Sequence, residues 1–76
     1  MSNTVRSVGF VPVELGSSVV VDVPVVAQEG AKAHIEHIES GIRIVVDESL
    51  DATRANKAVA ALMPSIIAAL SRKVLN

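Results

Sequence analysis

The pattern of apolar residues changes once along the chain, near Asp51. Before this residue, apolar and polar residues alternate in short segments rich in valine and isoleucine, which is typical of β-strands. After it, apolar residues recur every three or four positions, which is the spacing of an amphipathic helix. The pattern predicts one α+β domain over residues 1–76, with an antiparallel, Val-rich sheet of about four strands followed by a C-terminal helix. The predicted strands cover about 5–15, 19–27, 33–39 and 42–47, and the predicted helix covers about 52–75.

The second predicted strand has one apolar face. The alternate valines of Val19–Val25 point one way and Asp22 and Pro24 point the other way, so the valine face is expected to point inward. Pro12 and Pro24 lack the N–H that a sheet ladder needs, so each strand is predicted to lie at an edge or to break at its proline. Exposed Val-rich edges favour pairing with another chain.

Residues 33–40 read A-H-I-E-H-I-E-S and fit either a helix or a strand. In a helix, His34 and His37 lie one turn apart and can both reach one metal ion. In a strand, they point to opposite faces and cannot share an ion. The strand is favoured because the apolar alternation of residues 42–46 needs a neighbouring strand, and the nearest candidate lies directly upstream.

A two-residue turn at Ser40-Gly41 would join these two strands. This turn places Ile35 across from Val46, on the apolar face of the sheet. It directs His34 and Glu36 toward the other face, where a solvated, charged surface is expected.

The helical segment has a predicted start and one irregular point. The carboxylate of Asp51 can cap the first turn, because it can accept a hydrogen bond from a free backbone N–H. Pro64 removes one backbone hydrogen bond, so it predicts a helix that is kinked or split near this residue. The apolar stripe along the helix consists of Ala55, Val59, Leu62, Ile66, Leu70 and Val74.

The composition indicates a thin core. Valine and alanine dominate the apolar residues, Phe10 is the single aromatic residue, and the chain has no cysteine. A chain of this size buries only about 60% of its unfolded surface, and small domains usually add a disulfide, a metal or a second subunit. Since cysteine is absent, we expect a homodimer or a larger assembly. The residues expected to pack against the sheet or a subunit are Val59, Leu62, Ile66 and Leu70.

The net charge of −1 is unevenly distributed. Residues 28–51 hold six acidic and two basic residues, a balance of −4, and residues 52–76 hold four basic residues and no acid, a balance of +4. This separation suits contacts between acidic and basic segments or subunits. The alternative is contact with nucleic-acid phosphates, for which the sequence offers no interleaved aromatic residues. The four basic residues are Arg54, Lys57, Arg72 and Lys73.

Candidate chemistry is limited to one short segment. Zinc needs three or four ligands in a defined geometry, and no further ligand of known position accompanies the two histidines. Glycine-rich phosphate loops, serine elbows and paired catalytic carboxylates are missing from the sequence. We expect a protein that is not an enzyme and holds no cofactor, with a His-based metal or acid–base site as an alternative. The candidates for that site are His34, Glu36, His37 and Glu39.

The sequence gives little indication of a membrane. The first fifteen residues lack a basic start followed by an apolar core. No apolar run approaches the roughly 20 residues that a spanning helix needs. We therefore expect a cytoplasmic protein, with a membrane-surface helix at residues 65–75 as the competing interpretation, because that segment is amphipathic and carries two cations.

Residues 10–15, F-V-P-V-E-L, resemble the F-V-P-V segment of small accessory proteins of the sixty-six family of bacterial insertion sequences. In that family, a β-hairpin of alternating Ile, Glu, Val and Arg follows, and then an acidic turn and a short helix. Ile35-Glu36, residues 41–47 and residues 59–62 are similar here, so the resemblance covers about half of the chain. It implies kinship with the hairpin–helix part of that family. The family's N-terminal helix-turn-helix has no counterpart in this sequence, so the resemblance does not extend to DNA recognition.

These observations favour a non-catalytic interaction or assembly module that binds copies of itself, or another protein. The alternative is a nucleic-acid-associated accessory protein from a mobile element.

Overall fold

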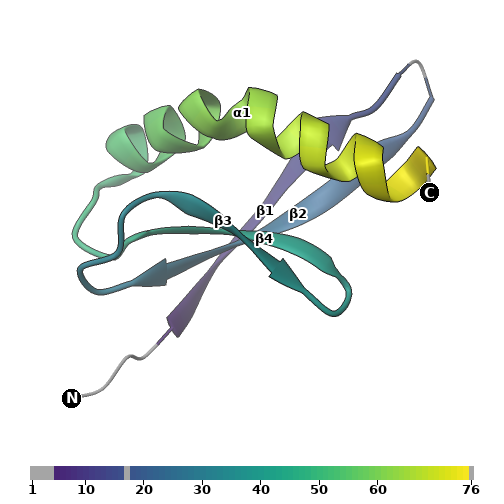
Figure 1. Ribbon diagram of the computed structural model, residues 1–76. Helices are drawn as coiled ribbons and strands as arrows, with labels where there is room; N and C mark the ends of the chain where they lie inside the picture. The colour runs from purple at the N-terminus through teal and green to yellow at the C-terminus, as the bar shows by residue number, and fades with distance from the viewer. Residues whose placement is uncertain (1–4, 17, 76) are drawn as a thin grey trace.

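The structure is a computed structural model that describes residues 5–16 and 18–75, with side chains as far as residue 72. Its strands form one sheet in the order β1-β2-β4-β3, and the helix lies across one face of this sheet (Figure 1). The predicted α+β class, the four strands and the C-terminal helix are confirmed, with strand ends within one residue of the predicted positions. The elements are β1 (Val5–Glu14), β2 (Val20–Gln28), β3 (His34–Ile38), β4 (Gly41–Asp47) and α1 (Ala52–Leu75).

The sheet is mixed, so the prediction of a wholly antiparallel sheet is wrong. β1 and β2 are antiparallel, as are β3 and β4, but β2 and β4 run parallel. The chain leaves β2, passes the end of β4 to reach the edge strand β3, and returns into the middle of the sheet as β4. The middle position suits β4 because its centre is buried on both faces: Ile44 faces α1, Val45 faces the other way, and both are fully buried.

The β3–β4 hairpin confirms that residues 34–38 are a strand. Its turn lies at Glu39–Ser40, one residue earlier than predicted, so Ile35 pairs with Ile44 instead of Val46. Because the register moves by two residues, Ile35 stays on the apolar face and packs against the core, as expected.

The two strand prolines occupy different positions. Pro12 lies in β1, which is an edge strand as predicted. Pro24 lies in β2, which is interior and continuous through the proline, so the prediction of an edge or a break is wrong for this strand. The parallel ladder between β2 and β4 begins at Val25, directly after Pro24. The residue without an N–H therefore precedes the ladder and does not interrupt it.

Helix α1 is continuous through Pro64. The predicted split is therefore wrong, and the predicted kink is not shown. Pro64 lies on the exposed side of the helix, and the stripe residues Leu62 and Ile66 on either side of it keep the same face toward the sheet. The helix begins as predicted, because the Asp51 carboxylate Oδ1 accepts a hydrogen bond from the Arg54 backbone N–H at 2.8 Å.

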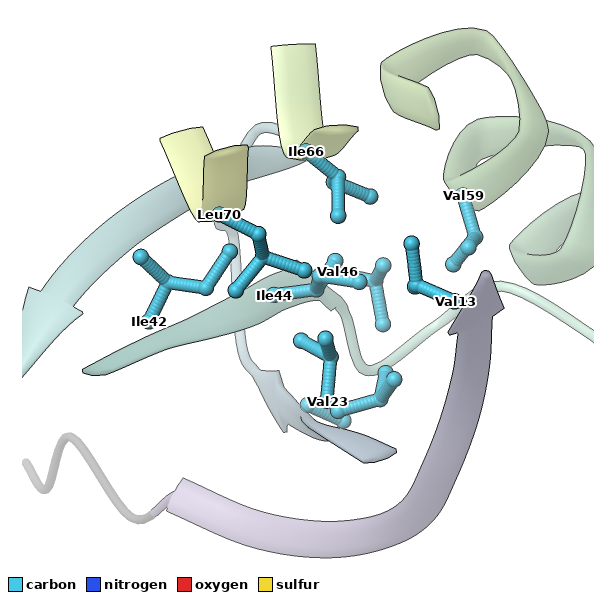
Figure 2. Close-up of a cluster of buried hydrophobic side chains, with 10 residues drawn as sticks. Val13, Val23, Ile42, Ile44, Val46, Val59, Ile66 and Leu70 are labelled. Atoms are coloured by element: carbon cyan, nitrogen blue, oxygen red, sulfur yellow. The ribbon is translucent and has the colours of Figure 1, made fainter. Parts of the chain in front are cut away.

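The core lies between α1 and the middle of the sheet. Ile66 and Leu70 point from α1 toward β4, and Val59 points toward Val13 of β1 (Figure 2). The helix runs closest to β4 and β3 and farther from β1 and β2. The cover that α1 gives to the sheet is therefore uneven. The buried cluster consists of Val13, Val23, Val25, Ala27, Ile42, Ile44, Val46, Val59, Ile66 and Leu70.

Substituting Ile66 tests this account of the core. Ile66 is 0% exposed and its sequence neighbour Ile67 is 39% exposed. Ile66→Ala is expected to lower the free energy of unfolding by about 2–5 kcal/mol, because it removes apolar contacts and leaves a cavity. Ile67→Ala is the matched control and should cost less than about 1 kcal/mol. Urea unfolding measures both, and equal losses would contradict the placement of the helix.

If Ile66→Ala fails to fold, Ile66→Val serves in its place, with an expected loss of about 0.5–1.5 kcal/mol.

Candidate interaction surface

Four residues of the predicted apolar stripe of α1 pack against the chain's own sheet, and the side chain of Val74 lies outside the described residues. Val59, Ile66 and Leu70 are 7%, 0% and 6% exposed, and Leu62 is half-buried against the same core. The sequence predicted that these four residues pack against either the sheet or another subunit. The structure places them against the sheet. A second chain therefore needs a different surface.

Exposed apolar side chains gather on the β1 side of the sheet. Three of them lie on β1, and two more lie at the start of β2 or directly before it. Phe10, the only aromatic residue, is 68% exposed. We name this set of five residues the β1–β2 apolar surface: Val5, Val8, Phe10, Val19 and Val20. The five residues are spread along the β1–β2 pair, from Val5, which pairs with Gln28, to Val20, which pairs with Glu14. Exposed apolar side chains of this size are common at interaction sites. Among the described residues, the one other large apolar side chain with such exposure is Ile67 of α1.

A β-bulge in β1 contributes to this exposure. The pairing of β1 with β2 shifts between Ser7 and Gly9, so Val8 has no partner on β2. Val8 is 53% exposed. The bulge was not predicted, although a glycine inside a strand pattern, here Gly9, is its usual signal.

Two shallow hollows extend the apolar surface into the gap between β1 and α1. The helix lies nearer to β4 and β3 than to β1, and Val13 of β1 and Val59 of α1 separate the two hollows as members of the core. The first hollow is lined by Val8, Gly9, Phe10, Val11, Val25, Ala55, Asn56 and Val59. The second is lined by Pro12, Val13, Glu14, Val20, Met63 and Ile67.

The backbone of β1 is paired on one side only. The Leu15 N–H donates to the Val19 carbonyl at 2.8 Å, so Leu15 faces β2. Because successive residues of a strand face opposite sides, the N–H and C=O groups of Phe10 and Glu14 face the free edge. Phe10 lies opposite Pro24 of β2, which has no N–H to donate to the Phe10 carbonyl. This agrees with a Phe10 backbone that faces the free edge and not β2. The edge thus carries unpaired donors and acceptors beside exposed apolar side chains.

A polar network lies on the opposite face of the sheet, away from α1. Glu36 Oε1 accepts a hydrogen bond from Nε of Arg43 at 2.7 Å and forms an ion pair with Nη2 of the same side chain, also at 2.7 Å. Glu36 Oε2 lies 3.3 Å from Nε2 of His34, and Nδ1 of His34 donates to the Lys32 carbonyl. The expected charged face is therefore present as one connected network. Both carboxylate oxygens are engaged within the chain.

The network shifts two pKa values. The Lys32 carbonyl, and then the Glu36 carboxylate, raise the pKa of His34 because they stabilise its protonated ring. The Arg43 guanidinium, and then His34, lower the pKa of Glu36. Both shifts come from hydrogen bonds within the chain, so they point to a structural role for these side chains.

The two histidines lie on opposite faces of β3, because this segment is a strand. His34 and His37 therefore cannot share a metal ion. Glu39 is exposed in the hairpin turn. In the part of the chain that the structure describes, no group of three or more His, Asp or Glu side chains is arranged to hold a metal ion.

The basic residues of α1 do not form one compact patch. Arg54, Lys57 and Arg72 are exposed. Arg54 and Arg72 are separated by about 27 Å along the axis, at a rise of about 1.5 Å per residue. The side chain of Lys73 lies outside the described residues. Contact with nucleic acid stays a prediction.

Within the described residues, α1 lacks the long apolar stretch that a membrane-spanning helix needs.

Comparisons with known protein families, with characterised proteins and with solved structures find no match to this chain. The resemblance to accessory proteins of bacterial insertion sequences stays a prediction.

The pH dependence of stability tests the His34 contacts. Because folding raises the pKa of His34, its contribution to stability is complete below the ordinary value of 6.5 and is lost as the pH rises through the raised pKa. His34→Gln should therefore lower the free energy of unfolding at pH values below 6.5 and have little effect well above the raised pKa. Urea unfolding over this pH range measures the difference.

Glu36 stays ionised over that pH range, because its pKa is lowered from the ordinary 4.5. His37→Gln is the control, since His37 points to the other face of the sheet. A His34→Gln effect that is the same at every pH would contradict the assignment.

Proposed function

We propose that the protein is a non-catalytic interaction module that associates with copies of itself through the β1–β2 apolar surface. The observation that carries this proposal is that five of the six exposed large apolar side chains of the described residues belong to β1, to the start of β2 or to the residue before it. Covering an exposed Phe or Val side chain contributes about 1.5–3 kcal/mol when burial is complete. A second copy offers the same apolar side chains and can cover them reciprocally.

The shifted pKa values support a structural role for the polar groups. Among the described residues, shifts occur at His34, Glu36 and Asp47. The first two belong to the polar network. The Ser49 backbone N–H, which donates to Asp47 Oδ1 at 3.0 Å, lowers the pKa of Asp47 in the turn after β4. None of the three lines either hollow beside β1.

Sedimentation equilibrium tests the proposal. The wild-type mass is expected to rise from 7.9 kDa toward twice that value as the concentration increases from the micromolar to the millimolar range. Phe10→Ser should keep the mass near 7.9 kDa, because it removes the largest exposed apolar side chain of the surface. Lys57→Ser, on the exposed side of α1, is the control and should associate like the wild type.

Circular dichroism verifies that both variants keep the fold. A wild-type mass that stays at 7.9 kDa across the whole concentration range would contradict the proposal.

A further inference from the structure

Val45 is buried on the side of the sheet that α1 does not cover. Its exposed fraction is 0%, yet it does not belong to the buried cluster beneath the helix. Among the described residues, it is the one buried apolar side chain that faces away from α1. Since α1 lies on the opposite face, neighbouring side chains of the sheet itself cover Val45.

The strand register identifies these neighbours. Val26 of β2 lies directly opposite Val45 on one side, and His34 of β3 lies directly opposite it on the other side. Side chains at opposite positions of neighbouring strands lie side by side on the same face of the sheet. In the next pair on this face, Glu36 lies opposite Arg43. Val45 is therefore flanked by Val26 and by the His34 ring with the polar network around it.

The His34 ring has an acceptor next to each of its two nitrogens. Nδ1 contacts the Lys32 carbonyl, and Nε2 lies 3.3 Å from Oε2 of Glu36. A neutral imidazole donates from one nitrogen only, whereas the imidazolium donates from both. The protonated ring alone can therefore satisfy both contacts. In either neutral tautomer, one ring lone pair faces an oxygen lone pair, and that contact becomes repulsive.

Arg43 holds Glu36 in place beside the ring. Oε1 of Glu36 lies 2.7 Å from both Nε and Nη2 of Arg43. The Arg43 guanidinium, and then His34, lower the pKa of Glu36, so the carboxylate stays ionised while His34 titrates. Asp47, the next charged residue on this face of β4, accepts a hydrogen bond from the Ser49 N–H at 3.0 Å. The charged side chains that act on the His34 ring are therefore Glu36 and Arg43.

We propose that the His34 ring is a pH-sensitive cover over Val45. The imidazolium is tied to the Lys32 carbonyl and to Glu36, and these two contacts hold the ring beside Val45. When the proton passes to water, one contact becomes repulsive and the ring, whose side chain is already 44% exposed, turns into solvent. Val45 then becomes exposed beside Val26. The open face of the sheet thereby gains an apolar site, and no covalent bond changes.

This cover is independent of the proposed association. β3 and β1 are the opposite edges of the sheet, and the β1–β2 apolar surface does not include His34 or Val45. A chain that stays monomeric keeps the cover, and a chain that associates through the β1–β2 apolar surface keeps it as well.

The direction of the His34 pKa shift agrees with the cover. The Lys32 carbonyl, and then the Glu36 carboxylate, raise the pKa of His34. Because the pKa in the folded chain lies above the ordinary value of 6.5, the cover is complete below pH 6.5 and is lost as the pH rises through the raised pKa. The open face is therefore polar in mildly acidic solution and more apolar in alkaline solution.

Methyl NMR with a neutral gadolinium chelate tests the cover. The chelate broadens the signals of methyl groups that solvent reaches, and methyl protons do not exchange with water as the pH changes. The broadening of the Val45 methyls should increase several-fold as the pH rises through the raised pKa of His34. The ring nitrogen chemical shifts of His34 give the midpoint of its titration, and the two midpoints should coincide. Ile44, equally buried but beneath α1, is the internal reference and should not change.

Three variants separate the cover from other effects of pH. His34→Gln should show the same Val45 broadening at every pH, because glutamine does not titrate. Glu36→Gln should lower the midpoint, because it removes the carboxylate that stabilises the imidazolium. His37→Gln, on the other face of β3, is the control and should keep the wild-type transition. A Val45 broadening that stays constant while His34 titrates, or a transition that persists in His34→Gln, would overturn the inference.

Discussion

The packing of α1 onto β4 is the contact on which the rest of the structure depends. Ile44 on β4 and Ile66 on α1 are both fully buried, and they meet at the centre of the core. The centre of β4 is buried on both faces, because Val45 is fully buried on the side away from the helix. Such a strand needs a neighbour on each side, so it lies between β2 and β3. A helix laid on this strand covers the middle of the sheet and one flank.

The flank left with less cover is β1. This strand pairs with β2 on one side and presents its other side to solvent. It also carries exposed Val8 and Phe10 beside the gap under α1. Natural edge strands usually reduce their capacity for pairing with charges, bulges or proline. β1 has a bulge and Pro12, and these features leave few favourable registers for a further strand.

Local signals predicted the helix and the strands, and long-range contacts decided the rest. Asp51 and the apolar stripe fixed the start of α1 and its buried face, because capping and helical periodicity are properties of neighbouring residues. The parallel pairing of β2 and β4 joins distant segments, and alternation within each strand does not reveal it. The same limit applies to the interaction surface. Periodicity identified the apolar side of Val59 and Ile66, but it does not distinguish packing within a chain from packing between chains. The exposure of Phe10 follows from the edge position of β1, which the sequence indicated only through Pro12.

Amide hydrogen exchange of the wild-type chain, followed by NMR at low and high protein concentration, tests the central claim most directly. The Val13 N–H faces β2, so it should be protected at both concentrations. The Phe10 N–H faces the free edge, so it should exchange quickly at low concentration and become protected as the copies associate. Protection of Phe10 that does not change with concentration, or new protection confined to β3, would contradict the account.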